Sequence, residues 1–222
     1  MTYKESFLRF MVDCGVLTFG EFTLKSGRKA PYFINAGNYH SGAQLMELGR
    51  YYAACIAEHN IPVETVFGPA YKGIPLAAAA AVALADKYQK DVNFCFDRKE
   101  VKDHGEGGMF VGKKLTDGEK VVIIEDVTTA GTSIEETLPI IKAQGDVDVL
   151  GLVVSVDRCE RGKGEKSALT EIQEKYGFRT TAIVTMKEVV EHLYNKEYKG
   201  KVIIDDTLKA AIDAYYEQYG VK

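Results

Sequence analysis

The chain has 222 residues, of which 46% are apolar and 27% charged, and its formal net charge at pH 7 is −4. This length and composition are typical of one globular core with at most a small accessory lobe. The acidic balance disfavours binding of nucleic acid through a broad basic surface, and no apolar run approaches the 18 or so residues of a membrane-spanning helix.

The four cysteines, Cys14, Cys55, Cys95 and Cys159, are far apart in the chain and form no CxxC pair. Isolated cysteines of this kind are usually small buried hydrophobes, and they suit a reducing compartment. The N-terminal residues carry acid and lack the apolar core of a secretory signal. We therefore expect a cytoplasmic protein, and no His/Cys cluster indicates a zinc site.

The first 40 residues predict a helix followed by a small strand-rich lobe. Apolar positions over residues 3–14 recur at helical spacing and stop at Gly15. Three short β-prone pieces follow between residues 16 and 36, separated by glycines.

From residue 42 onward helices and strands alternate, which predicts a mostly parallel sheet with helices on both faces. Helices are expected at 42–59, 74–88, 132–144, 165–176 and 187–195, and strands at 65–67, 92–96, 121–124, 149–156 and 180–184. Ligands of such sheets bind beyond the carboxyl ends of the strands, so chemistry is expected in the loops that follow them. A closing helix is expected to pack through Leu208, Ala211, Ile212 and Tyr215.

The most informative segment, residues 121–133, reads Val-Val-Ile-Ile-Glu-Asp-Val-Thr-Thr-Ala-Gly-Thr-Ser. A buried strand ends in Glu125 and Asp126, and a loop of small and hydroxyl residues then opens a helix. Hydroxyls and free backbone N–H groups at a helix N-terminus bind phosphate, whereas the carboxylates would repel it and should face another group, such as ribose hydroxyls. The plainer interpretation, an acidic turn with a Thr/Ser helix cap, is disfavoured by this order of residues. The segment matches neither a P-loop nor GxGxxG.

Four other segments carry candidate polar residues. Residues 67–75 place Lys72 in a Gly/Pro turn, and residues 98–108 combine three cations and a histidine with three acids and several glycines. Taken alone, the first fits a solvated turn and the second a solvated hairpin tip, although the glycines also suit a mobile lid. Residues 24–35 resemble a basic β-turn, and Arg158 follows a buried strand where it could pair with a carboxylate through a bidentate fork.

Together these five segments resemble type I phosphoribosyltransferases, and the wording of residues 67–75 and 98–108 is most similar to the orotate branch of that family. The resemblance covers about residues 5–195, with the motifs in family order. Departures are Glu125-Asp126 where many members have Asp-Asp, Ile34 where a second Phe is frequent, and Thr128 where a branched apolar residue is common. None removes a functional group that the chemistry needs.

The resemblance implies an α/β fold with a central, mostly parallel sheet flanked by helices, the type I phosphoribosyltransferase fold, in one domain spanning residues 1–222. Residues 1–40 are expected to form a small strand-rich hood over the active site. A non-proline cis peptide bond has precedent in the loop type of residues 67–75, and a cis bond here, if present, would lie at Ala70–Tyr71 and would signal a functional constraint.

The implied activity transfers the phosphoribosyl group of phosphoribosyl pyrophosphate to N1 of orotate, giving orotidine 5′-monophosphate and pyrophosphate in pyrimidine biosynthesis. Mg²⁺ is expected as cofactor, held mainly by substrate and water rather than by a protein metal site. A homodimer is expected, in which the lid, residues 98–108, reaches the partner's site. The alternatives are a purine-base phosphoribosyltransferase, a non-catalytic regulator on the same fold, and a generic nucleotide-binding α/β protein.

By the same resemblance, Glu125 and Asp126 hold the ribose hydroxyls and Thr129 to Ser133 hold the 5′-phosphate. Lys102 and His104 are the candidates for stabilising or protonating the leaving group. The full set expected to bind phosphoribosyl pyrophosphate is Lys25, Tyr71, Lys72, Arg98, Lys99, Lys102, His104, Glu125, Asp126, Val127, Thr128, Thr129, Ala130, Gly131, Thr132 and Ser133, and the set for orotate is Phe33, Ile34, Thr129 and Arg158.

Overall fold

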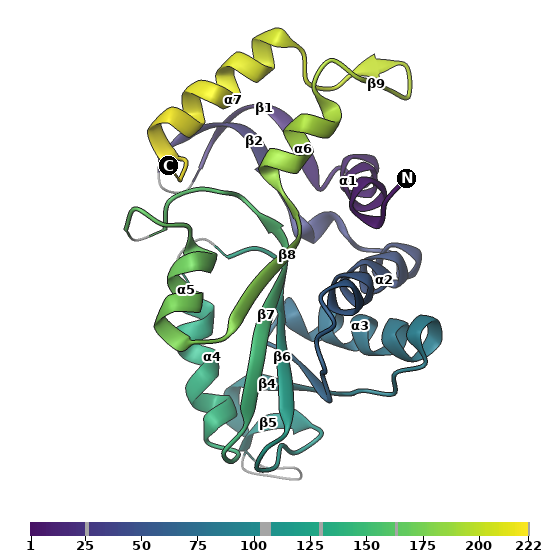
Figure 1. Ribbon diagram of the computed structural model, residues 1–222, viewed down its shortest axis with the longest axis vertical. Helices are drawn as coiled ribbons and strands as arrows, with labels where there is room; N and C mark the ends of the chain where they lie inside the picture. Colours follow the sequence, from purple (N-terminus) through teal and green to yellow (C-terminus); the bar gives the residue numbers. More distant parts are fainter. Residues whose placement is uncertain (25–26, 103–107, 129–130, 163, 222) are drawn as a thin grey trace.

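The computed structural model describes residues 1–24, 27–102, 108–128, 131–162 and 164–221, with only the backbone at 101, 102 and 108. Within these residues a six-stranded sheet of order β5-β4-β3-β6-β7-β8 forms the centre (Figure 1). All its neighbouring strands are parallel except β5, which pairs antiparallel with β4. The predicted α/β fold with a mostly parallel sheet is confirmed.

The sheet strands follow the predicted order along the chain, with one addition at the edge. They are β3 (Thr65–Gly68), β4 (Asn93–Lys102), β5 (Gly108–Gly112), β6 (Lys120–Glu125), β7 (Asp148–Asp157) and β8 (Arg179–Thr185). The intervening helices are α2 (Gly42–Glu58), α3 (Gly73–Tyr88), α4 (Thr132–Lys142), α5 (Ala168–Tyr176) and α6 (Met186–Leu193).

Alternate side chains of β6 belong to two hydrophobic cores, one on each face of the sheet. Because successive side chains of a strand point to opposite faces, Val122 and Ile124 join a core with α1, α2 and α3, whereas Val121 and Ile123 join a second core with α4 and α5. All four side chains are fully buried. The continuous apolar run therefore reflects a strand covered on both sides, as predicted.

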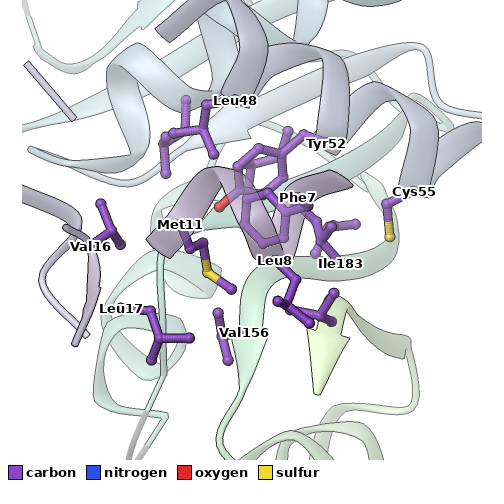
Figure 2. Close-up of a cluster of buried hydrophobic side chains, with 14 of the residues drawn as sticks. Phe7, Leu8, Met11, Val16, Leu17, Leu48, Tyr52, Cys55, Val156 and Ile183 are labelled. Atoms are coloured by element: carbon purple, nitrogen blue, oxygen red, sulfur yellow. The ribbon is translucent and has the colours of Figure 1, made fainter. Parts of the chain in front are cut away.

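The N-terminal segments pack into the first of these cores. The helix α1 (Tyr3–Asp13) begins at a capping box between Thr2 and Glu5, which satisfies backbone N–H groups at its start. Its buried face presents Phe7, Leu8 and Met11 to α2 and to Val156 and Ile183 of the sheet (Figure 2). The hydrophobic core of the lobe is thus continuous with that of the sheet.

A separate two-stranded sheet follows α1, formed by β1 (Leu17–Thr23) and β2 (Lys29–Ile34). The sequence predicted two separate β-prone pieces where β1 is continuous. Gly20 accounts for the difference, because it adopts φ +149° at a shift of register between Phe19 and Phe22, and the strand continues beyond this bulge.

The C-terminal segment completes this end of the molecule. A short hairpin, β9 (Glu197–Tyr198) and β10 (Lys201–Val202), precedes α7 (Asp206–Tyr219), which lies across β2 (Figure 1). Of the predicted packing stripe, Ile212 and Tyr215 are buried and Leu208 is partly buried. The prediction is wrong for Ala211, which is exposed and lines a groove between α7 and the β1–β2 sheet.

The sequence missed β5 and the outer half of β4, because both are charged or glycine-rich and lie at the edge of the sheet. An edge pair needs no apolar alternation, so the periodicity that marks the inner strands is absent there.

None of the helices in the described part of the chain is long and apolar enough to cross a membrane. All four cysteines are free, and three of them are buried as predicted.

Candidate active site

The carboxyl ends of β3, β6 and β7 bring the predicted functional loops to one edge of the sheet. Loop 69–72 follows β3, Asp126 follows β6, and Arg158 follows β7. The ammonium group of Lys72 lies 3.1 Å from a carboxylate oxygen of Asp126, so two loops that are 54 positions apart in the sequence meet directly. This edge is where ligands of parallel α/β sheets bind.

Glu125 and Asp126 differ in their electrostatic surroundings. Burial raises the pKa of Glu125 to about 7, and the neighbouring charge of Asp126 adds to this rise, whereas a hydrogen bond from the Ser133 hydroxyl and the charges of Lys99 and Lys72 oppose it. Asp126 accepts a 2.7 Å hydrogen bond from the N–H of Val127 and pairs with Lys72. Glu125 can therefore titrate near neutral pH, beside the ion pair of Asp126 with Lys72.

Two buried hydroxyls hold the backbone beneath these carboxylates. Tyr52 donates to the carbonyl of Glu125 and Ser155 to that of Asp126, each over 2.6 Å. The N–H of Ser155 also reaches the Asp126 carbonyl, at 2.9 Å. Sequence reasoning missed both residues. Ser155 gave a signal, as the polar residue within an apolar strand, but Tyr52 resembled any core aromatic residue of a helix.

The start of α4 has the features of an anion site. Its N-cap is Gly131, at φ +69°, and no side chain caps the helix. The carbonyl of Gly131 accepts its first helical hydrogen bonds from Ile134 and Glu135, so the N–H groups of Thr132 and Ser133 precede the helical ladder. The Thr128 hydroxyl accepts from the N–H of Gly131 at 3.3 Å. Of the predicted phosphate loop, Thr129 and Ala130 lie outside the described residues.

Loop 69–72 is a tight turn with two exposed side chains. The Ala70–Tyr71 peptide bond is cis, at the position where the loop type of this family has precedent for one. The Tyr71 side chain is 71% exposed and that of Lys72 67% exposed, so both are open to a ligand.

The first residues of the predicted lid, 98–102, lie on β4. Its Lys99 pairs with Glu136 of α4 in the same chain, at 3.3 Å, and this brings its charge close enough to influence Glu125. Arg98 lies beside it on β4. The side chain of Lys102, together with His104 and Lys25, lies outside the described residues.

Arg158 belongs to a network that the sequence did not predict. Its guanidinium group donates twice to one oxygen of Glu160, at 2.7 and 3.1 Å, and lies over the ring of Tyr32. Tyr32 donates to the same Glu160 oxygen at 2.6 Å, and Tyr216 of α7 donates to the Arg158 carbonyl at 2.7 Å. The arginine is therefore held in place by groups from β2 and α7.

The two remaining residues expected at the orotate site lie on β2. Phe33 is 41% exposed and stacks on Phe22 with 5.7 Å between ring centroids, whereas Ile34 is partly buried against the core. Phe33 thus offers an accessible aromatic surface, whereas Ile34 packs against the protein core.

A cavity of about 340 Å³ adjoins the carboxylates. Asp126, Lys72, Tyr52 and Ser155 line it together with most of the segment 36–42, which leads from β2 into α2. The sequence gave no functional signal for residues 36–42 beyond a glycine-containing turn. Among the described residues, no group of three or more His, Cys, Asp or Glu side chains is arranged to hold a metal ion.

Comparisons with known proteins agree with this geometry. The family model described as "Phosphoribosyl transferase domain" matches residues 35–180. The chain is 65% identical over 221 residues to an orotate phosphoribosyltransferase of Lachnoclostridium phytofermentans, covering 99% of this chain and 98% of that one. Identity to the enzyme of that name from Pseudomonas fluorescens Pf-5 is 50%, over 99% of both chains.

A crystal structure of the orotate phosphoribosyltransferase of Francisella tularensis superposes with a TM-score of 0.84 and 39% identity, covering 97% of this chain and 99% of that chain. Sequence and structure agree over nearly the full length. The chain therefore belongs to the orotate phosphoribosyltransferase family.

Proposed function

We propose that this protein transfers the phosphoribosyl group of phosphoribosyl pyrophosphate to N1 of orotate, releasing pyrophosphate and forming orotidine 5′-monophosphate for pyrimidine biosynthesis. The observation that carries the proposal is the 3.1 Å contact between Lys72 and Asp126, in a chain of this family. It brings a cation suited to pyrophosphate beside a carboxylate suited to ribose. The two halves of the donor substrate would then lie on either side of the bond that breaks.

Catalysis would consist mainly of placing charge. The transition state of glycosyl transfer carries positive charge on the sugar and growing negative charge on the leaving group. Glu125 and Asp126 would accept hydrogen bonds from the ribose hydroxyls and offset the charge on the ring. The N–H groups at the start of α4, with the hydroxyls of Thr129 and Thr132, would hold the 5′-phosphate.

Cations from several segments would meet the pyrophosphate. Lys72 and Tyr71 would act from loop 69–72, with Lys25 from the β1–β2 turn. The contact of Lys99 with its own chain's Glu136 supports a role for Lys99 in the site of its own subunit.

We further propose a homodimer, in which the lid brings Arg98, Lys102 and His104 into the partner's site. Lys102 and His104 would stabilise or protonate the departing pyrophosphate. The support for this sharing is the family resemblance of the lid sequence.

Mg²⁺ fits this site as an ion carried by the substrate. Mg²⁺ prefers oxygen ligands in octahedral geometry and seldom uses a cage made only of protein groups. Glu125 and Asp126 supply oxygens, but Asp126 is already engaged by Lys72, so most ligands would come from substrate and water. When bound, the ion would neutralise charge on the pyrophosphate.

Orotate would be recognised through its carboxylate by Arg158, and its ring would lie against Phe33 with Ile34 behind and Thr129 nearby.

We also propose that the chain works as one domain, in which residues 1–40 form the hood of the active site. Its support is the hydrophobic core shared by α1, α2 and the sheet. Four free cysteines suit the cytoplasm, where we place the protein.

The decisive experiment follows the loss of orotate absorbance in the presence of phosphoribosyl pyrophosphate and Mg²⁺. Adenine, guanine and hypoxanthine serve as competing bases. Turnover is expected with orotate as the base and not with adenine, guanine or hypoxanthine. Preference for a purine would identify a purine-base enzyme, and binding of ligand or DNA without turnover would identify a regulator on this fold.

A further inference from the structure

Asp97 is a buried carboxylate at the mouth of the site to which none of the roles above applies. It lies on β4 and is 3% exposed. One of its oxygens accepts a 2.6 Å hydrogen bond from the backbone N–H of Ala70. A hydrogen bond from an amide to a carboxylate is shorter and stronger than one between neutral groups, so its loss would remove a substantial constraint on the partly buried Ala70 amide.

The register of the sheet explains why Asp97 meets loop 69–72. The strand β3 ends at Gly68, which pairs with Phe96 of β4. Asp97 is thus the first residue of β4 beyond the end of its neighbour, where the chain of β3 has turned away. Because β3 does not extend beside Asp97, the Asp97 side chain can reach the backbone of loop 69–72.

Contacts between main-chain atoms hold the two ends of loop 69–72 together. A Cβ atom at Gly68 would lie 2.1 Å from the carbonyl oxygen of Gly73, so these two glycines pack main chain against main chain. The N–H of Gly73 donates to the carbonyl of Pro69 at 2.9 Å. Because Tyr71 and Lys72 are largely exposed, their positions depend on how this backbone is held.

Asp97 also stands at the base of the lid. Arg98 and Lys99 follow it directly, and it pairs with Phe110 of β5. The ring of Phe110 packs on that of Phe67, the residue before Gly68, with 5.7 Å between centroids. Strands β4 and β5 and the start of loop 69–72 therefore lie close together at the position of Asp97.

We propose that Asp97 is a positioning residue that fixes loop 69–72 relative to the base of the lid, so that Tyr71 and Lys72 face pyrophosphate correctly. The inference rests on the proposed function and concerns the pyrophosphate half of the site alone. Loss of the acceptor frees the Ala70 amide and lets the loop move, while the orotate side keeps its own supports on β2, β7 and α7.

The test compares Asp97→Leu with Asp97→Asn. Asn keeps an oxygen where Ala70 needs it, whereas Leu has a similar volume and no acceptor. For Asp97→Leu we expect KM for phosphoribosyl pyrophosphate, and for pyrophosphate in the reverse reaction, to rise about ten-fold, or about 1.4 kcal/mol. KM for orotate should stay within about two-fold, and Asp97→Asn should recover most of the loss. If Asp97→Leu fails to fold, Asp97→Ala makes the same comparison.

Thr65→Val is the matched control. Thr65 is fully buried at the opposite end of β3 and donates to the buried carboxylate of Glu119, so its loss should lower Tm without changing either KM. Equal increases of KM for both substrates, an Asn variant as impaired as Leu, or the same kinetic change in Thr65→Val would overturn the proposal.

Calorimetric titration with pyrophosphate separates this proposal from the proposed function. An active wild type whose Asp97→Leu variant binds pyrophosphate normally would refute the positioning role alone. A wild type that binds pyrophosphate but does not consume orotate would refute the proposed function, and weaker binding by the variant would still support the role of Asp97.

Discussion

Tyr216 of α7 donates a 2.7 Å hydrogen bond to the main-chain carbonyl of Arg158. Two backbone bonds join the same segments: the N–H of Arg161 donates to Tyr219, and that of Val221 donates to Cys159. The arginine loop, residues 158–161, is therefore fastened to the C-terminal helix. That helix lies outside residues 35–180, which match the domain model.

Tyr216→Phe is expected to weaken orotate binding selectively. The change removes one hydroxyl, whose hydrogen bond is worth about 1 kcal/mol, so KM for orotate should rise up to about five-fold. KM for phosphoribosyl pyrophosphate should not change. Tyr198→Phe is the control, because its hydroxyl bonds Asp13 away from the site. Equal shifts of both constants would contradict a role for α7 at the orotate end.

Arg158→Ala should raise KM for orotate more than KM for phosphoribosyl pyrophosphate, since of these two substrates only orotate has a planar carboxylate that could pair with an arginine. It should also lower stability by about 3 kcal/mol, because Glu160 is left buried without its partner. The double variant Arg158→Ala/Glu160→Gln separates the two effects. It should recover Tm while KM for orotate stays high, and recovery of both would mean that Arg158 is only structural.

Asp126→Asn should lower kcat/KM by at least about ten-fold, or about 1.4 kcal/mol, with little change of Tm. The change removes a charge beyond the end of β6 rather than a core group. Asp148→Asn, an exposed carboxylate at the opposite end of β7, provides the comparison. Activity within about three-fold of wild type would show that Asp126 lacks the assigned role.

The raised pKa of Glu125 predicts a pH dependence of both activity and stability. As pH rises through about 7, Glu125 loses its proton in the free enzyme, so kcat/KM for phosphoribosyl pyrophosphate should rise over this range. The folded state holds this proton more tightly than the unfolded state, whose pKa is near 4.5. The free energy of unfolding should therefore fall as pH rises from about 4.5 to about 7. Glu125→Gln should lack both changes, and their persistence there would assign them to another group.

A shared lid predicts that two inactive variants can restore each other. If Lys102 acts in the partner's site, a mixed dimer of Lys102→Ala and Asp126→Asn has one site with both defects and one with neither. After random exchange of equal amounts, about half the dimers are mixed and about a quarter of all sites are intact. The assay compares the mixture with each parent, and native mass spectrometry verifies exchange. No recovery in verified mixed dimers would mean that the lid acts within its own subunit.

The sequence predicted those parts of the site that depend on local order. An apolar run followed by Glu125, Asp126 and a small-residue loop strongly predicts a buried strand whose carboxyl end lies at a ligand site. The helix positions followed from periodicity and capping for the same reason. These features depend on residues that are close together in the sequence, so they can be predicted without knowing the rest of the fold.

The supports of the site could not be predicted, because they join distant segments through main-chain atoms. Tyr52 bonds a carbonyl 73 positions away, and Asp97 bonds an amide 27 positions away. Any residue offers a carbonyl or an amide, so nothing in the sequence marks the partner. Glu160 has side-chain partners instead, but one of them, Tyr32, lies 128 positions away, so the sequence did not indicate this contact either.

Tyr32 and Tyr216, whose hydroxyls lie 3.2 Å apart, are separated by 184 positions in the chain. At the ribosome, where about 5–20 residues are added each second, the second of them is made roughly 10–40 s after the first. The strand ends for which we propose contact with the phosphates are all synthesised within that interval. The segments proposed to bind the sugar phosphate are therefore translated first, and the contacts of Tyr216 with Tyr32 and Arg158 can form only after α7 has been translated.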